Sequence, residues 1–220
     1  MKILAISDPH GDYSKIRAIK KRAGDFDLVV VLGDITHFGP DEKVEEFVEM
    51  FEKPILAIPG NCDHKSILKA LDASKATNLH GKAKQIEKIR FIGLGGSNPT
   101  PFNTAFELSE EEIGTTLEKM VCSAESEEDC KTIVLLTHAP PCGARDELPA
   151  PAGHVGSTAI QKFLDRVDLI ICGHIHEARG MDTVGHTIVV NPGEASKGFG
   201  ALITIDEFGD KHIEVKFISV

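Results

Sequence analysis

The sequence lacks any apolar run long enough to cross a membrane. No segment approaches the ~18 apolar residues that a transmembrane helix needs. The apolar run after Met1 and Lys2 stops at Asp8, which makes it too short for the core of a signal peptide, and no small-residue cleavage site follows it. We therefore expect a cytoplasmic protein with no membrane partner.

Basic residues are in deficit. The 220 residues include 24 lysines and arginines against 34 aspartates and glutamates, which gives a formal net charge of −10. A chain with this balance has no general attraction for polyanions, so the composition argues against nucleic acid as a partner. Bound divalent cations would still make one site locally positive.

Paired cysteine motifs are also missing. The five cysteines are an odd number, and no two have C-x-x-C spacing, which argues against a zinc ribbon or a disulfide scaffold. Cys122 and Cys130 could pair, but free thiols are the expectation for a cytosolic chain. Cys172 lies in an apolar run and is expected to be buried.

What the sequence does contain is an alternation of apolar runs and helical patterns. With 41% hydrophobic residues, the chain can build one sizeable core, and we expect a single domain spanning residues 1–220. Short apolar runs at residues 3–7, 27–32 and 54–58 enclose helical patterns at 12–24 and 41–51. Continuous apolar strands of this kind are buried on both faces of a parallel sheet.

The second half of the chain follows the same alternation and then changes. Helices are expected at residues 109–122, where Ser109 and Glu112 form a capping box, and at 158–166. Asp12 is the expected N-cap of the first helix. The expected strands of this half cover residues 90–94, 132–136, 168–172, 187–190, 201–205 and 213–218. The last three have no helices between them, so they are expected to be antiparallel, in a fold of two packed mixed sheets.

Polar residues stand where the first three strands end. Asp8 and His10, then Asp34, then Asn61 follow the three runs in turn. Ligands bind beyond the carboxyl ends of strands in open α/β sheets, so these side chains should meet at one edge. Two irregular stretches, residues 97–108 and 139–156, follow strands that end at the same edge, and they are expected to shape a site.

These side chains suit a pair of divalent ions. Oxygen and imidazole donors bind Mn, Fe, Ni, Zn or Mg, and one carboxylate can bridge two ions. Asp34 is the natural bridge, and Asn61 offers a neutral carbonyl oxygen. The expected metal ligands are Asp8, His10, Asp34, Asn61, His138, His174 and His176. Asp8, His10 and His176 would hold the first ion, while His138 and His174 would complete the second.

Five short motifs in order resemble those of the calcineurin-like metallophosphoesterases. They are Asp8-Pro9-His10, Gly33-Asp34, Gly60-Asn61-Cys62-Asp63, Thr137-His138 and Gly173-His174-Ile175-His176. Each is weak alone, but five in order at strand ends form a specific signal. The resemblance implies an α/β fold, a four-layer αββα sandwich of two mixed sheets flanked by helices. It also implies two metal ions and hydrolysis of a phosphate-ester substrate by a metal-activated hydroxide.

One position departs from the commonest pattern of this family. Many members have a histidine after Gly-Asn, where it acts on the leaving group, whereas this chain has Cys62, as phosphodiesterase-like branches do. The resemblance therefore favours phosphodiesters over small phosphomonoesters. The catalytic candidates are Asp34 and Asn61 at the ions and Cys62 in the place of that histidine. A thiol near a divalent ion loses its proton easily and is a poor proton donor, so Asp63, His64 or His154 could substitute, or the substrate needs little acid help.

Two other functions remain open for a chain of this fold. One is a non-catalytic, protein-binding scaffold like the retromer-subunit branch, in which the metal site is degraded. The other is a nuclease, against which the acidic charge argues. The oligomeric state is open between a monomer and a homodimer. Histidines without a motif are expected in surface or turn positions; they are His37, His80, His186 and His212.

Overall fold

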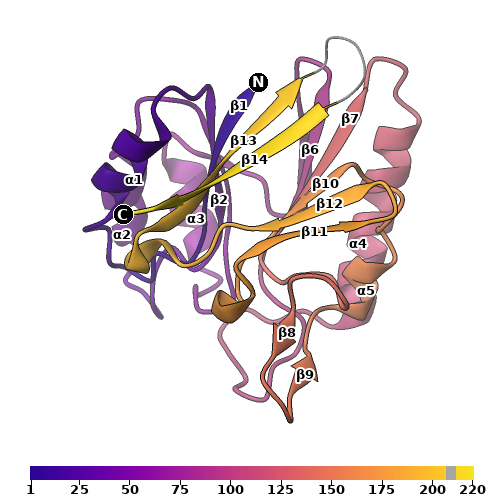
Figure 1. Cartoon of the computed structure of the whole chain (residues 1–220). Helices are drawn as coiled ribbons and strands as arrows, with labels where there is room; N and C mark the ends of the chain where they lie inside the picture. Colours follow the sequence, from indigo (N-terminus) through magenta and orange to yellow (C-terminus); the bar gives the residue numbers. More distant parts are fainter. Residues whose placement is uncertain (207–211) are drawn as a thin grey trace.

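Two six-stranded sheets lie face to face, with helices on both outer faces (Figure 1). The structure is a computed structural model that describes residues 1–206 and 212–220. The first sheet has the order β14-β13-β1-β2-β3-β4, and the second has the order β11-β12-β10-β7-β6-β5. The αββα arrangement expected from the resemblance is therefore confirmed.

Parallel pairing dominates the centre of each sheet. The first sheet contains β1 (Lys2–Ile6), β2 (Leu28–Leu32), β3 (Ile55–Ile58), β4 (Thr77–Asn78), β13 (Phe199–Asp206) and β14 (His212–Ser219). The second contains β5 (Lys82–Ile86), β6 (Ile89–Leu94), β7 (Thr132–Thr137), β10 (Leu169–Ile171), β11 (Gly180–Val184) and β12 (Thr187–Asn191). Strands β1, β2, β3 and β4 are parallel, as are β6, β7, β10 and β12. Their carboxyl ends therefore share an edge within each sheet.

Helices cover each sheet on its outer face. The first sheet carries α1 (Ile16–Ala23), α2 (Lys43–Val48) and α3 (Ile67–Ala73), and the second carries α4 (Glu110–Glu125) and α5 (Thr158–Gln161). Three buried apolar layers result, two between helices and a sheet and one between the sheets. The middle layer explains the continuous apolar runs, because β1 and β2 bury side chains on both faces.

The structure corrects several element boundaries. Helix α1 begins at Ile16, and the Asp12 carboxylate accepts a hydrogen bond from the Ser14 backbone N–H, so Asp12 caps a turn and not the helix. The Ser109–Glu112 capping box is present, but α4 runs on to Glu125 because Ala124 packs in the core. Helix α5 ends at Gln161 and gives way to turns.

Strand pairing also differs from expectation in places. Strand β13 is antiparallel to both β1 and β14, as expected. Strand β12, however, pairs parallel with β10 and antiparallel with β11. The sequence reading missed β5, β11 and α3. Strands β5 and β11 lie at the edges of the second sheet and mix polar with apolar residues, so neither shows a continuous apolar run.

The two irregular loops differ from each other. Residues 97–108 carry no strand or helix, as expected. Residues 139–156, expected to be irregular, include a small hairpin of β8 (Glu147–Leu148) and β9 (Gly153–His154) that stands out from the fold in Figure 1.

The cysteine and membrane expectations can be checked in the described residues. All five cysteines are free, so Cys122 and Cys130 do not pair, and Cys172 is buried. No helix within residues 1–206 and 212–220 is both long enough and apolar enough to pass through a bilayer.

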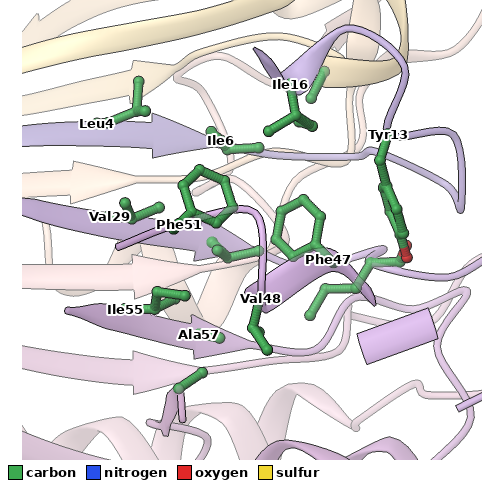
Figure 2. Close-up of a cluster of buried hydrophobic side chains, with 14 of the residues drawn as sticks. Leu4, Ile6, Tyr13, Ile16, Val29, Phe47, Val48, Phe51, Ile55 and Ala57 are labelled. Atoms are coloured by element: carbon green, nitrogen blue, oxygen red, sulfur yellow. The ribbon is translucent and has the colours of Figure 1, made fainter. Parts of the chain in front are cut away.

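Aromatic packing anchors α2 to the first sheet. Figure 2 shows the rings of Phe47 and Phe51 in a cluster with Tyr13 and strand residues such as Val29. The Phe47 ring centroid lies 5.0 Å from that of Tyr13 and 5.4 Å from that of Phe51. Tyr13 lies in the loop that follows His10, so this cluster also supports the site edge of the sheet.

We predict that Phe47→Ala lowers the free energy of unfolding by about 3–5 kcal/mol, because Phe47 is fully buried and the change leaves a cavity. Phe102→Ala, at a ring that is 82% exposed, should change it by less than about 0.5 kcal/mol. Urea unfolding followed by circular dichroism measures both. Equal effects of the two changes would contradict this account of the core.

Candidate metal centre

The polar residues that follow five strands meet at the seam between the two sheets. Asp8, Asp34 and Asn61 follow β1, β2 and β3, while His138 and His174 follow β7 and β10. Asp8, His10, Asp34 and His174 all have left-handed backbone, with φ of 54°, 47°, 50° and 66°. Such backbone costs about 1–3 kcal/mol per residue and persists where the surroundings fix it, often at functional sites.

Two motif glycines allow the close approach of the strand ends. A Cβ on Gly60 would lie 2.0 Å from Asp34 Oδ1, and a Cβ on Gly173 would lie 2.7 Å from Asp8 Oδ2. Any side chain at either position would push a carboxylate out of place. The Gly-Asn and Gly-His motifs therefore require glycine for steric reasons.

Asp34 lies between two groups of potential ligands. Its Oδ2 is 3.8 Å from His10 Nδ1 on one side and 3.5 Å from His138 Nε2 on the other. Its Oδ1 accepts a hydrogen bond of 2.8 Å from the Cys62 backbone N–H, which fixes the carboxylate. This is the geometry that a bridging carboxylate needs.

The first group consists of Asp8, His10 and His176. The Nε2 atoms of the two imidazoles lie 3.3 Å apart, and His176 Nε2 is 3.6 Å from Asp8 Oδ1. Within the described residues, His10 Nδ1 is buried and has no hydrogen-bond partner. A buried nitrogen lone pair beside a carboxylate is a suitable donor for a cation.

The second group consists of Asn61, His138 and His174. The His138 Nδ1–H donates a hydrogen bond to the Leu32 carbonyl over 2.7 Å. The lone pair of Nε2 is then available to bind a metal ion. That Nε2 lies 2.8 Å from Asn61 Oδ1, so two donor atoms converge with Asp34 on one point. The His174 ring centroid is 5.0 Å from that of His138.

The buried charges of this centre require positive charge nearby. Asp8 and Asp34 are 1% and 2% exposed. Burial opposes a charge on His138, yet the two carboxylates raise the pKa of His138 to about 9. Burial and the neighbouring His138 lower the pKa of His174 to about 4. Two buried carboxylates surrounded by imidazole nitrogens and an amide oxygen suit divalent cations. Bound cations would balance the carboxylate charges in place of a protonated His138.

The sequence reading missed Glu194. Its Oε2 lies 3.0 Å from His176 Nδ1 and 2.7 Å from Lys197 Nζ, and its side chain is mostly buried. A carboxylate on the far nitrogen of a metal-binding imidazole fixes the ring orientation and raises its basicity. Glu194 directly follows Asn191-Pro192-Gly193, a turn that marks the region in sequence. Sequence alone cannot pair it with His176.

Cys62 and the three candidates for the proton donor occupy different places. Asp63 is fully buried, and its oxygens accept hydrogen bonds from the backbone N–H groups of Ile35, Thr36 and Gly60 and from the Thr36 hydroxyl. Burial and the Asp34 carboxylate raise the pKa of Asp63 to about 6, but these four donors hold it as a structural link. Burial, and then Asp34, also raise the pKa of the Cys62 thiol.

The two histidine candidates lie on loops. His64 is exposed, with its ring centroid 6.3 Å from that of Phe38. His154 lies in β9, and its Nδ1 is 2.7 Å from the buried carboxylate of Asp146. Strand β8 of the same hairpin packs on η1 (His176–Ala178), which places the hairpin beside the centre.

Two of the histidines without a motif make contacts that the sequence did not indicate, although His37 has the expected surface position. His37 is exposed, but it packs edge-on against His10, with ring centroids 5.4 Å apart. His80 is half-buried, accepts a hydrogen bond from the Gly95 backbone N–H and packs on Phe106. Neither contact could be found from sequence, because both join loops that are distant in the chain.

The loop at residues 97–108 touches the centre directly. The Asn61 amide donates to Thr104 Oγ1 over 3.1 Å, and the Phe106 backbone N–H donates to the Asn61 carbonyl. Asn98 donates to the Val155 carbonyl and so links this loop to the β8–β9 segment. The two irregular loops thus form joined walls on one side of the centre.

Comparisons with known proteins agree with this geometry. The chain belongs to the calcineurin-like phosphoesterase family, whose sequence profile matches residues 1–178. The uncharacterised protein MJ1162 of Methanocaldococcus jannaschii is 42% identical over 205 residues, which cover 89% of each chain. The 3',5'-cyclic adenosine monophosphate phosphodiesterase CpdA of Escherichia coli K12 is 27% identical over 188 residues, which cover 80% of this chain and 64% of CpdA.

The comparison with solved structures shows a shared fold. A dimetal phosphatase from Danio rerio superposes with a TM-score of 0.68 at 14% identity, covering 100% of this chain and 96% of that chain. Members of the family typically bind divalent metal ions, and the clustered carboxylates and imidazoles described above are candidate ligands in this chain.

We predict that Glu194→Gln weakens binding of one divalent ion about 10–100-fold, because His176 loses its carboxylate partner. Glu111→Gln, at an exposed position in the first turn of α4, should leave metal affinity unchanged. Calorimetric titration of metal-free protein with Mn²⁺ measures both variants. Identical affinities in the two variants would exclude a role for Glu194 at the centre.

Proposed function

We propose that this chain is a dinuclear-metal phosphoesterase that hydrolyses phosphodiesters in preference to small phosphomonoesters. The observation that carries the proposal is the position of Asp34. Its Oδ2 faces His10 on one side and His138 on the other, at the centre of seven potential ligands. Asp8, His10, Asp34 and His176 would hold one ion, and Asp34, Asn61, His138 and His174 would hold the other.

A pair of divalent ions would supply Lewis acidity, which lowers the pKa of a water molecule towards neutrality and offsets charge on phosphoryl oxygens. The protein's own contribution is preorganisation. The Cys62 N–H holds Asp34, the Leu32 carbonyl holds His138, and Glu194 holds His176. Groups fixed in this way do not need to reorganise as charge develops in the transition state.

Strained backbone supports catalysis over a scaffold role. Four of the seven proposed ligands have left-handed backbone, and a surface that only binds another protein has no need of strain at buried positions. All seven positions also carry competent donor atoms, unlike a degraded site. Mn, Fe, Ni, Zn and Mg all suit this set of nitrogen and oxygen donors.

Two features favour diesters. CpdA, a phosphodiesterase by name, is similar to this chain over 80% of the chain's length. Phe38 and Phe102 expose 47% and 82% of their surface on the loops that border the centre. Exposed rings of this kind can pack on the second organic substituent of a diester, which a monoester lacks.

We predict that Asp34→Asn, which removes the negative charge of the carboxylate proposed to bind both ions, lowers the occupancy of at least one metal ion. Turnover should fall by at least about 100-fold, since the charge of the bridge is lost. Wild-type protein loaded with Mn²⁺ or Ni²⁺ should contain two ions per chain by mass spectrometry and should hydrolyse esters in a screen.

The control for that variant is His186→Gln, at an exposed turn position that is paired with Asp165 and precedes the amino end of β12, at the opposite edge from the ligands that follow β7 and β10. It should keep both ions and full turnover. Near-native turnover and metal content in Asp34→Asn would contradict the bridging role and the dinuclear mechanism.

For the diester preference, kcat/KM for bis(4-nitrophenyl) phosphate should equal or exceed that for 4-nitrophenyl phosphate. Phe102→Ala should lower the diester value by about 5–10-fold, because one apolar contact worth ~1 kcal/mol is lost, and should spare the monoester. Steady-state kinetics with equal metal loading measures both. Hydrolysis of the monoester alone would reject the preference.

A further inference from the structure

The motif residues provide no strong hydrogen-bond donor for the oxygen of the leaving group. All four hydrogen-bonding contacts of Asp63 are internal, and the residue is fully buried. Cys62 carries a thiol, which is a weak hydrogen-bond donor. His154 directs its Nδ1 to Asp146 and, in the described residues, belongs to none of the clusters of potential ligands. None of these three groups offers a strong, unengaged N–H or O–H to the departing oxygen.

His37 lies at the open side of the centre. A ring nitrogen of His37, a ring nitrogen of His10 and the Cys62 sulfur all lie within 4.8 Å of one another. His37 is exposed, whereas His10 and Cys62 are partly buried. The imidazole of His37 thus stands between the proposed ligands and solvent, where a substituent leaving the phosphorus would pass.

The backbone on both sides of His37 is fixed. Before it, the Thr36 N–H and hydroxyl both donate to Asp63 over 2.8 Å. After it, the Phe38 N–H donates to the Cys62 carbonyl over 2.9 Å, and the Gly39 N–H donates to Thr36 Oγ1 over 3.1 Å. Asp63 also accepts from the Gly60 N–H, so one buried carboxylate ties the His37 loop to the Gly-Asn-Cys-Asp turn.

The ring of His37 is restrained as well. The Phe38 ring packs edge-on against it at a centroid distance of 4.9 Å, and the His10 ring lies on another side. His64, the other exposed histidine nearby, makes its ring contact with Phe38 and belongs to none of the ligand clusters in the described residues. His37 is therefore the better placed of the two.

We propose that His37 donates a hydrogen bond to the leaving-group oxygen of the ester. The role rests on the proposed phosphoesterase function. In the reaction, the oxygen of water bonds to phosphorus, the phosphorus–oxygen ester bond breaks, and its electron pair goes to the departing alcohol oxygen, which finally takes up one proton of the water. An N–H aimed at that oxygen stabilises charge that exists only in the transition state.

The test compares leaving groups of different acidity. Bis(4-nitrophenyl) phosphate expels a stabilised anion, whereas diphenyl phosphate expels a more basic one that needs the donor more. His37→Phe keeps a flat ring against Phe38 but removes both nitrogens. It should lower kcat about 100-fold on diphenyl phosphate and less than about tenfold on the nitrophenyl diester, with metal content unchanged.

Two comparisons separate this role from a structural one. His37→Gln retains an N–H donor and should recover much of the rate on diphenyl phosphate, and His186→Gln should match the wild type on both esters. A readout independent of turnover is the modification of histidines by diethyl pyrocarbonate, followed by mass spectrometry. A non-hydrolysable phosphonate diester should slow modification of His37 and not that of His186.

The outcomes are distinguishable. If the wild type cleaves neither ester with any metal, the proposed function is wrong, and the role of His37 falls with it. If the wild type cleaves both and His37→Phe lowers both rates equally, or if the phosphonate leaves His37 unprotected, only the inference about His37 is overturned.

Discussion

Two carboxylates buried at the seam between the sheets set the requirements for the rest of the structure. Asp8 and Asp34 are almost fully enclosed, and an uncompensated charge in such a place costs several kcal/mol. Imidazoles at the ends of β7 and β10 approach the two acids from the opposite sheet. At this edge, electrostatic attraction between the carboxylates and the imidazoles therefore joins the two sheets, in addition to the apolar layer between them.

Backbone geometry serves that arrangement. Glycines at 60 and 173 let the strand ends approach the carboxylates within distances that no side chain would permit. Left-handed backbone at Asp8 and Asp34 turns the chain sharply as it leaves each strand. The strain is balanced by parallel strands with buried apolar side chains on both faces, which give a rigid base for a strained edge.

Asp63 illustrates how a motif residue can act at a distance. Its type and position make it a candidate for chemistry in the sequence, but its four hydrogen bonds use its oxygens to join two loops. The result is a fixed position for His37, which carries no motif of its own. In the mechanism we propose, Asp63 and His37 together would take the part that the resemblance assigns to a single histidine after Gly-Asn.

The sequence by itself determined where the main strands lie along the chain, that the core of the first sheet is parallel, and that polar residues gather at the strand ends. Each of these follows from local patterns, because apolar runs define strands and parallel strands share an edge. The edge strands β5 and β11 were not predicted, because their mixed polar and apolar residues show neither a continuous apolar run nor a strict alternation. Only the tertiary structure decided that Glu194 meets His176, that His37 meets His10 and that Asp63 faces inward. Those contacts join segments that are distant in the chain, and the packing of the two sheets and their loops, which no local pattern encodes, brings them together.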